Sequence, residues 1–308
     1  MESNLLTAED VAKQLRIKKY TVYELIKRGE FPSSKVGRQM RISQSDIDLY
    51  LQANKTGVHP LPQETPNEEP LSKKNNAGPV IICGQDACLD LFLTQLGRTG
   101  EFVLRSFMGC YNGLIALYNG RITMATAHLW DSETDTYNYS FIRFLLPGLP
   151  VGVLRLAGRM EGFYVKKGNP LNIWNWKDLA RPEITMINRE RGCGARILLD
   201  QKLLTLGINA AKIRGYTQEI SSHMVCASAV AKSDADVGIG CERGAESIAG
   251  VEFIPLQLEW YDFIFRLEDR ETHAVKTIVS YATGEEFKRD LLSMGGYDIS
   301  QTGAYREF

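Results

Sequence analysis

The stretch LLTAEDVAKQLRIKKYTVYELIKRGEFPSSKVGRQMRIS, residues 5–43, decides the fold of the N-terminal part of the chain. Thr7 can cap a helix, and Asp10, three residues later, brings the pattern close to a capping box. Apolar residues recur at helical spacing up to Leu15, and a second helix is predicted over residues 20–27 after a short basic turn. Two short helices joined by a tight turn are typical of a helix-turn-helix, whose second helix enters the major groove of DNA.

A small hairpin is predicted after the second helix. Gly29 ends that helix, and residues 35–42 read as two short strands around the basic tip at residues 37–39. Ser43 or Ser45 can cap a last helix. This order resembles the winged helix-turn-helix of the excisionase family, which is related to MerR-type regulators. The resemblance covers the whole module and implies a small α winged helix-turn-helix DNA-binding domain over residues 1–54.

Basic residues gather on the turn, the second helix and the hairpin, which predicts contacts with double-stranded DNA. The residues expected at the DNA are Lys18, Lys19, Tyr20, Thr21, Lys27, Arg28, Lys35, Arg38 and Arg41. Nine basic residues face seven acidic ones in this module, so its net charge is only +2. We therefore expect a homodimer, because a second module doubles the phosphate contacts. The alternative is a small protein-interaction domain whose charges are simply solvated.

Length and composition predict a soluble protein of two domains. The chain has 308 residues, 44% of them hydrophobic, and a formal net charge of −1, which excludes wholesale coating of nucleic acid but permits one DNA-reading face. The first residues lack the pattern of a signal peptide, and no stretch is apolar enough to cross a membrane, so a cytoplasmic location is expected. The six cysteines show no metal-ligand spacing, and we expect reduced thiols with no metal and no cofactor.

After the DNA-reading module, residues 55–79 read as a proline-rich linker, because they hold too few apolar residues to form a core. Strand and helix patterns then alternate. The expected strands are residues 80–83, 102–107, 122–125, 184–187 and 236–240, and the expected helices are 87–96, 111–119 and 195–206. This alternation predicts βαβ units around a mainly parallel sheet.

Four segments of this larger part carry a second resemblance. They are HLWDSETDTYNYSFIRFLLPG (128–148), NRERGCGARILLD (188–200), IRGYTQEISSHMVCASAVAKSDADVGIG (213–240) and GGYDISQTG (295–303). In this order they resemble the periplasmic-binding-protein-like domain of the molybdate-binding type, which occurs fused to helix-turn-helix modules in bacterial and archaeal regulators. The resemblance implies a two-lobed α/β fold of type II over residues 80–308, with a ligand in the cleft between the lobes. Lobe one would comprise residues 80–157 and 262–308, and lobe two residues 158–261.

Three strand-to-helix turns can point backbone N–H groups into this cleft, and a helix N-terminus favours an anion. The turns begin at Gly84, Gly109 and Gly192, and arginines beside the third can supply forked donors. The residues expected at the ligand are Gln85, Asp86, Gly109, Cys110, Tyr111, Asn112, His128, Arg191, Gly192, Cys193, Gly194, Ala195, Arg196, His223, Asp236 and Tyr261. The alternative is that these are ordinary loops whose glycines only close tight turns.

The turns depart from the molybdate-type pattern, which usually offers small hydroxyl residues there. This chain has Gln85, Cys110, Cys193 and Ala195 instead. Because a thiol is a poorer donor than a hydroxyl, we expect molybdate to bind weakly and another small anion, a metabolite or a thiol-dependent ligand to bind in its place. The two cysteines can also be small buried apolar residues.

The combined prediction is a one-component transcription regulator, not an enzyme, that senses a small ligand in the cleft. Two alternatives remain open. One is an enzyme on the same scaffold, which would need a reactive thiol such as Cys193 and a base such as His128 or His223. The other is a recombination accessory protein, as the family of the N-terminal module suggests.

Overall fold

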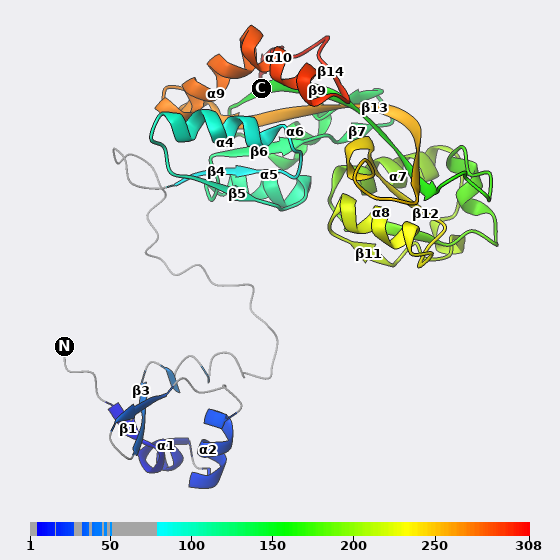
Figure 1. Cartoon of the computed structure of the whole chain (residues 1–308). Coiled ribbons are helices and arrows are strands. Elements are labelled where there is room, and N and C mark those ends of the chain that lie inside the picture. The colour runs from blue at the N-terminus through cyan, green and yellow to red at the C-terminus, as the bar shows by residue number, and fades with distance from the viewer. Residues whose placement is uncertain are drawn as a thin grey trace. The chain divides into compact units, whose positions relative to one another are not determined.

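The structure is a computed structural model that describes residues 5–15, 17–27, 33–36, 39–44, 46–47, 50 and 79–308. The chain divides into two compact units, Met1–Glu69 and Pro70–Phe308 (Figure 1). Residues 55–78 of the expected linker lie outside the described residues. The expected DNA contacts Arg28 and Arg38 also lie outside them.

The described part of the first unit includes helices α1 and α2, a three-stranded antiparallel sheet of order β1-β3-β2, and further helical residues at 44, 46–47 and 50. Its elements are β1 (Leu5–Thr7), α1 (Ala8–Leu15), α2 (Lys19–Lys27), β2 (Ser34–Val36) and β3 (Gln39–Ser43). The capping pattern predicted for the first helix is confirmed. The backbone N–H of Asp10 donates to the Thr7 hydroxyl at 3.2 Å, and the Asp10 carboxylate accepts from the Thr7 N–H at 3.0 Å.

One small apolar core joins the helices and the hairpin of this unit. Val11 from α1, Val22 from α2 and Ile42 from β3 are fully buried, and Ile47 packs with them. The helical spacing of the apolar residues therefore fixes which face of α2 is turned inward. The opposite face of α2 is exposed, with Tyr20 exposing 72% of its surface.

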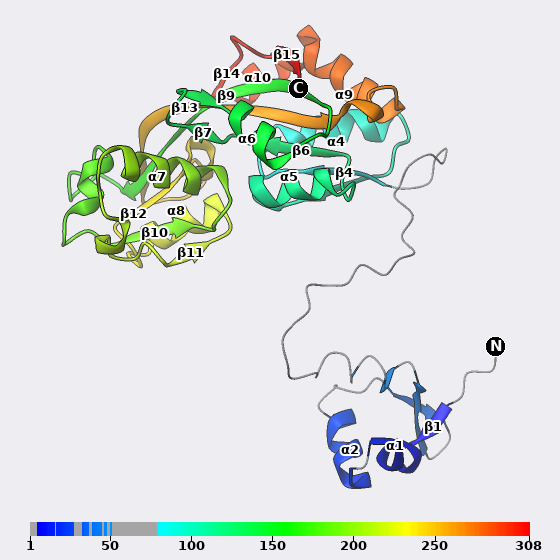
Figure 2. The ribbon, with the colours of Figure 1, turned by 180° about the vertical axis from the view of Figure 1, so that it is seen from behind.

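The second unit has two lobes joined by two long strands (Figures 1 and 2). The first lobe contains β4 (Val80–Cys83), α4 (Leu89–Arg98), β5 (Val103–Ser106), α5 (Cys110–Tyr118), β6 (Met124–Ala127), β7 (Trp130–Asp131), β8 (Thr136–Tyr137), α6 (Tyr139–Leu145), α9 (His273–Thr283), α10 (Glu285–Met294), β14 (Tyr297–Asp298) and β15 (Tyr305–Glu307). The second lobe contains β10 (Met186–Arg189), α7 (Gly194–Thr205), β11 (Glu219–Ile220), α8 (His223–Ala231) and β12 (Val237–Cys241). The joining strands are β9 (Val151–Lys166) and β13 (Val251–Arg266).

The main sheet runs in the order β11-β10-β12-β9-β13-β6-β4-β5. Parallel pairing, predicted from the alternation of strand and helix, is confirmed for β4 with β5 and β6 and for β10 with β11 and β12. The two joining strands pair antiparallel with each other and with their neighbours. The sheet is therefore mixed, and the prediction of a mainly parallel sheet is wrong for its centre, because the chain crosses between the lobes there in both directions.

Helices cover both faces of the strands in each lobe. In the first lobe α4, α9 and α10 pack on one face and α5 and α6 on the other (Figures 1 and 2). Phe92 of α4 anchors the first of these layers, with ring centroids 4.9 Å from Phe263 and 4.8 Å from Phe287. In the second lobe α7 and α8 contribute to separate apolar clusters. Among the described residues, no helix is long and apolar enough to cross a membrane.

Candidate functional site

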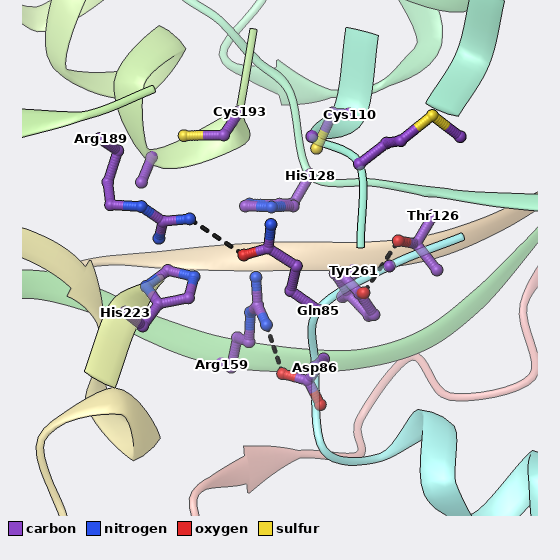
Figure 3. Close-up of a pocket in the computed structure, with 14 residues that line it drawn as sticks. Gln85, Asp86, Cys110, Thr126, His128, Arg159, Arg189, Cys193, His223 and Tyr261 are labelled. Carbon is purple, nitrogen blue, oxygen red and sulfur yellow. Dashed lines mark hydrogen bonds and ion pairs between the residues drawn. The ribbon is translucent and has the colours of Figure 1, made fainter. Parts of the chain in front are cut away.

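A small cavity lies between the two lobes, where the joining strands pass beneath it (Figure 3). Its volume is about 20 Å³. The residues that line it are Gly84, Gln85, Asp86, Met108, Gly109, Cys110, Thr126, His128, Arg159, Arg189, Cys193, Ala195, His223 and Tyr261. A space of this size holds a water molecule or a ligand of a few atoms.

The three predicted turns all reach the cavity. Two of them open directly into helices there, since α5 begins at Cys110 and α7 begins at Gly194. The first-turn N–H groups of a helix have no carbonyl partner in their own helix, so both N-termini offer donors at the cavity. A Cβ at position 194 would lie 2.3 Å from the His128 ring. Because Gly194 has no side chain, the N-terminus of α7 can approach this ring closely. A larger residue at this position cannot be accommodated without moving that ring.

A buried network of charges forms the floor of the cavity. Arg159 on β9 lies directly opposite Glu259 on β13, and its Nε donates to the Glu259 carboxylate at 2.6 Å. Its Nη1 also donates to Asp86 in the first lobe, and its guanidinium lies 4.4 Å from the centre of the Tyr261 ring. These charged side chains are almost completely buried. The arginine therefore ties the first turn of the cavity to the strands that join the lobes.

His128 continues this network to the thiol of Cys110. Its Nδ1 lies 2.7 Å from the Glu259 carboxylate. Burial alone lowers the pKa of His128, but the neighbouring Cys110 and Glu259 raise it to about 10. Burial alone raises the pKa of the Cys110 thiol, but His128 brings it below its ordinary value. The His128 ring thus lies between a carboxylate that favours its charged form and the Cys110 thiol, whose pKa it lowers, at the N-terminus of α5.

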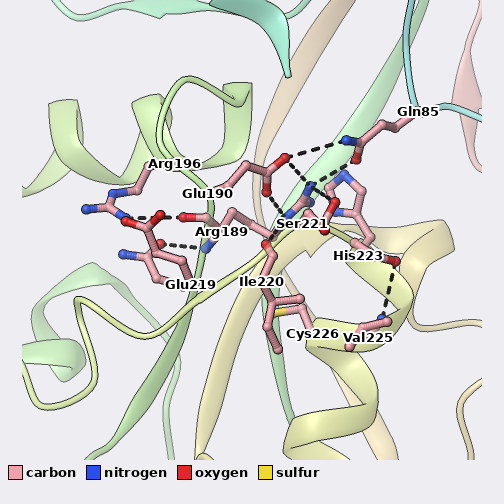
Figure 4. Close-up of polar contacts among 12 residues, drawn as sticks. Gln85, Arg189, Glu190, Arg196, Glu219, Ile220, Ser221, His223, Val225 and Cys226 are labelled. Atoms are coloured by element: carbon pink, nitrogen blue, oxygen red, sulfur yellow. Dashed lines mark hydrogen bonds and ion pairs between the residues drawn. The ribbon is translucent and has the colours of Figure 1, made fainter. Parts of the chain in front are cut away.

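Arg189 closes the cavity from the second lobe (Figure 4). Its Nη2 donates to Gln85 of the first lobe at 3.0 Å and to the Ser221 carbonyl at 3.2 Å, and its Nε donates to Glu190 at 3.1 Å. The residue exposes only 1% of its surface. Within the described part of the chain its Nη1 has no hydrogen-bond partner. An unpaired guanidinium N–H at a buried cavity is costly unless an acceptor binds there.

His223 at the start of α8 is a neutral partner of the cavity. Burial, followed by the charge of Arg189, holds its pKa well below the ordinary value. Its Nδ1 accepts from the backbone N–H of Cys241 at 3.3 Å. This histidine cannot serve as a cation for an anionic ligand, but its uncharged ring permits close packing at the cavity wall.

The structure brings many of the expected ligand residues together at the cavity. Those that line it are Gln85, Asp86, Gly109, Cys110, His128, Cys193, Ala195, His223 and Tyr261. The others lie in the same turns or farther away and do not line it: Tyr111, Asn112, Arg191, Gly192, Gly194, Arg196 and Asp236.

Three of the expected ligand residues have other partners. Arg196 points away from the cavity and pairs with Asp200 and Glu219. The side chain of Arg191 is 78% exposed. Asp236 accepts from the backbone N–H of Thr185 at 2.8 Å, which is a structural role at the start of β12.

The sequence prediction found Tyr261 on β13 but missed the charged residues of the joining strands. Arg159 and Glu259 were not expected at the site, and Arg189 was expected only to flank a turn. A signal was present, because β9 and β13 are long, largely apolar runs interrupted by charged residues. Charges in a buried strand need partners, so such interruptions indicate a paired cluster. Glu161 is a further member: its carboxyl is buried without a hydrogen-bond partner among the described residues, and burial and Glu259 raise its pKa well above the ordinary value.

The expected DNA-contacting residues that are described lie on α2 and the hairpin. Lys18 precedes α2, and Lys19, Tyr20, Thr21 and Lys27 are exposed on it. Lys35 lies in β2 and Arg41 in β3. Lys19 lies 3.1 Å from Glu9 of α1, an exposed ion pair of the kind that contributes little to stability. Lys19 can therefore leave Glu9 at little cost in stability and bind a DNA phosphate instead.

We predict that Lys19→Ala weakens binding to all DNA sequences alike and lowers the slope of log affinity against log salt by about one, as the loss of one phosphate contact should. Lys212→Ala, which removes the same charge from an exposed position of the other unit, serves as the control. Fluorescence anisotropy titrations at several salt concentrations measure both. Equal slopes for the two variants would show that Lys19 does not contact the DNA backbone.

Comparison with known families agrees with this architecture. Residues 5–55 match a helix-turn-helix domain model. Residues 94–283, more than half of the chain, match the model of the PBP superfamily domain. The chain belongs to the PBP superfamily. The expected helix-turn-helix and periplasmic-binding-protein-like domains are thereby confirmed, as is the fold class of a small helix-turn-helix unit followed by a two-lobed α/β domain. The molybdate-binding type stays a prediction.

Individual proteins of known sequence or structure are also similar to this chain. Protein YvgK of Bacillus subtilis is 38% identical over 304 residues, which is 98% of this chain and 97% of that protein. The tungstate ABC transporter structure from Geobacter sulfurreducens has a TM-score of 0.53 at 14% identity, covering 70% of this chain and 97% of the other. The regulatory domain of CcmR from Synechocystis, solved in complex with 2-PG, has a TM-score of 0.50 at 13% identity, covering 67% and 95%. At such identities the two structures show a common fold.

Proposed function

We propose that this chain is a one-component transcription regulator that binds double-stranded DNA through its helix-turn-helix unit and a small anion in the cavity between the lobes. The observation that most supports the ligand part is Arg189, which lines the cavity and whose buried Nη1 lacks a hydrogen-bond partner among the described residues. The N-termini of α5 and α7 add backbone donors and favourable dipoles at the same place. The fusion of the two domains supports the proposed DNA binding, because a ligand-binding domain and a DNA-binding domain in one chain allow the ligand to affect DNA binding directly.

The ligand of this proposal is a small oxyanion or a comparably small anionic metabolite. A cavity of about 20 Å³ suits a ligand of a few atoms. Cys110, Cys193 and Ala195 lie where hydroxyl donors would otherwise serve a tetrahedral oxyanion. Backbone N–H groups and Arg189 must therefore supply most of the hydrogen bonds, and molybdate or tungstate should bind more weakly than the preferred ligand.

Signal transmission in this proposal uses the contacts that cross the cleft. Gln85 of the first lobe accepts from Arg189 of the second at 3.0 Å, and the Tyr111 N–H donates to the Gly192 carbonyl at 3.0 Å. A ligand that bridges Arg189 and the N-terminus of α5 would strengthen the closed arrangement of the lobes. Closure shifts the DNA-binding units of a homodimer only if the ligand favours the closed state over the open one.

The proposal concerns a binding protein of the cytoplasm, not an enzyme. Cys110 and His128 are close, yet the acid–base chain ends in the fully buried Glu259, and the cavity holds only a few atoms. The homodimer rests on the weak net charge of the first module, for which two copies provide a larger DNA footprint.

Thermal unfolding of the full chain in the presence of an anion panel tests the ligand part. The panel comprises nitrate, sulfate, phosphate, molybdate and tungstate, with sodium chloride at matched ionic strength as the control. We expect at least one of these anions to stabilise the protein by about 2.7 kcal/mol at a hundred times its dissociation constant, with molybdate and tungstate weaker than the best one. Unchanged melting temperatures with all five would contradict the anion site. Strongest stabilisation by molybdate or tungstate would contradict the altered specificity.

A further inference from the structure

Two thiols from different lobes line the same cavity. Cys110 is the first residue of α5 in the first lobe, and Cys193 directly precedes α7 in the second. Both line the cavity, and Figure 3 shows both sulfurs on the same side of the His128 ring. The other four cysteines of the chain are buried away from this space. Of the six cysteines in the sequence, Cys110 and Cys193 are therefore the two that line the cavity.

The backbone around Cys110 contacts the backbone around Cys193 at the residues next to this pair. The N–H of Tyr111, the residue after Cys110, donates to the carbonyl of Gly192, the residue before Cys193, at 3.0 Å. A Cβ built on Gly109 would lie 3.3 Å from the Cα of Cys193. A disulfide requires Cα atoms about 4.4–6.8 Å apart. The contacts at the flanking residues place the two cysteines on adjacent backbone segments, and a bond between them requires their side chains to rotate towards each other.

The two thiols differ in reactivity. Cys110 lies at a helix N-terminus beside His128. The Nδ1 of this histidine lies 2.7 Å from the Glu259 carboxylate. The pKa of Cys110 is lowered, since His128 outweighs the effect of burial, whereas burial holds the pKa of Cys193 far above its ordinary value. Cys110 is thus the more readily ionised of the two thiols and Cys193 the less readily ionised, a difference that suits a reactive and a resolving cysteine.

The cavity also supplies what a small oxidant needs. Its volume of about 20 Å³ admits a molecule of two oxygen atoms but few larger reagents. The unpartnered Nη1 of the buried Arg189 can donate to an oxygen that gains negative charge.

We propose that Cys110 is a hydroperoxide-reactive cysteine and that Cys193 resolves its oxidised form as a disulfide that joins the two lobes. In the first step the Cys110 thiolate attacks one peroxide oxygen, the S–O bond forms and the O–O bond breaks. The leaving hydroxide takes a proton from the His128 imidazolium and departs as water. In the second step the Cys193 sulfur attacks the sulfenic acid, the S–S bond forms, the S–O bond breaks, and a second water leaves with the Cys193 proton. Two electrons pass from the two sulfurs to the peroxide.

The disulfide would hold the lobes together without a ligand. Its effect on DNA binding rests on the proposed function, but its formation does not. A covalent link between the N-termini of α5 and α7 occupies the place of the proposed anion and fixes the closed arrangement. The regulator would then respond to oxidant as well as to its ligand.

Peptide mass spectrometry of the full-length protein tests this proposal. The parent, Cys110→Ser, Cys193→Ser and the control Cys83→Ser are treated with a few equivalents of hydrogen peroxide and then quenched in denaturant that contains dimedone, so that the reagent reaches a buried sulfenic acid. Cys83 is buried beside Cys110 but does not line the cavity, so it is the matched control. We expect the parent and Cys83→Ser to form a Cys110–Cys193 disulfide. Cys193→Ser should stop at a dimedone adduct on Cys110, and Cys110→Ser should react at least tenfold more slowly.

Two results would overturn the proposal. One is oxidation of Cys110→Ser at the rate of the parent, which would place the reactive thiol elsewhere. The other is absence of the Cys110–Cys193 disulfide from the oxidised parent, even where Cys110 itself is modified. The assay contains neither DNA nor a candidate anion. A negative result would therefore overturn the redox proposal alone, and the anion site would still be decided by the thermal unfolding experiment.

Discussion

Arg159→Met is expected to destabilise the second unit by about 3–5 kcal/mol. Arg159 is buried and lies between Asp86 and Glu259, so the substitution leaves two buried carboxylates without their shared counter-ion. Removing one partner of a buried pair has this cost because the remaining charge is uncompensated in a medium of low polarity. The free energy of unfolding is measured by denaturant titration, followed by tryptophan fluorescence.

Arg270→Met is the matched control for this prediction. The Arg270 side chain is 56% exposed and lies 2.9 Å from the similarly exposed Glu307. An exposed pair of this kind contributes at most about 1 kcal/mol. If both variants lose the same small amount, the network around Arg159 does not hold the joining strands together as we describe.

The second large effect is expected for Arg189→Gln, which should weaken binding of the best anion of the panel by about 10–150-fold. A hydrogen bond to a charged group contributes about 1.5–3 kcal/mol, and each factor of ten in affinity corresponds to about 1.4 kcal/mol. Arg189→Lys keeps the charge but loses the forked geometry, so it should fall between the parent and the glutamine variant. Titration calorimetry on protein whose fold is verified by circular dichroism gives the dissociation constants.

Arg191→Gln provides the control on the same turn. This arginine lies two residues after Arg189, but its side chain is 78% exposed and faces Glu219 at 3.5 Å. Its loss removes the same formal charge without touching the cavity, so affinity should change less than threefold. Equal losses in the Arg189 and Arg191 variants would mean that the anion responds to overall charge, and the assignment of Nη1 as its donor would fail.

The first unit could be predicted closely from the sequence because its signals are local. The Thr7–Asp10 cap, the apolar spacing that buries Val11 and Val22, and the hairpin around residues 37–39 each depend on residues a few positions apart. Such patterns are set by hydrogen bonding and periodicity within one element. The predicted second helix over residues 20–27 corresponds to α2, which begins one residue earlier.

Only some of the residues at the cavity could be predicted from the sequence. The turns after β4, β5 and β10 carry glycines and precede helices, so Gln85, Cys110 and Cys193 could be named from local sequence. Arg159 and Glu259 could not be assigned, because their pairing depends on the register of two strands a hundred residues apart. Periodicity gives the face of a strand but not its partner across the sheet. Only the fold shows that these charges meet beneath the cavity.

The most direct test of the central claim is the DNA affinity of the full-length protein with and without its anion. The DNA is a fragment that the protein selects from a random-sequence library, and the anion is the one that gives the largest thermal stabilisation, added at a hundred times its dissociation constant and at constant ionic strength. We predict that the anion changes the dissociation constant for this DNA by at least tenfold, a coupling of about 1.4 kcal/mol, and that Arg189→Gln abolishes the change. The same DNA affinity with and without the bound anion would contradict the claim that this chain is a ligand-responsive regulator.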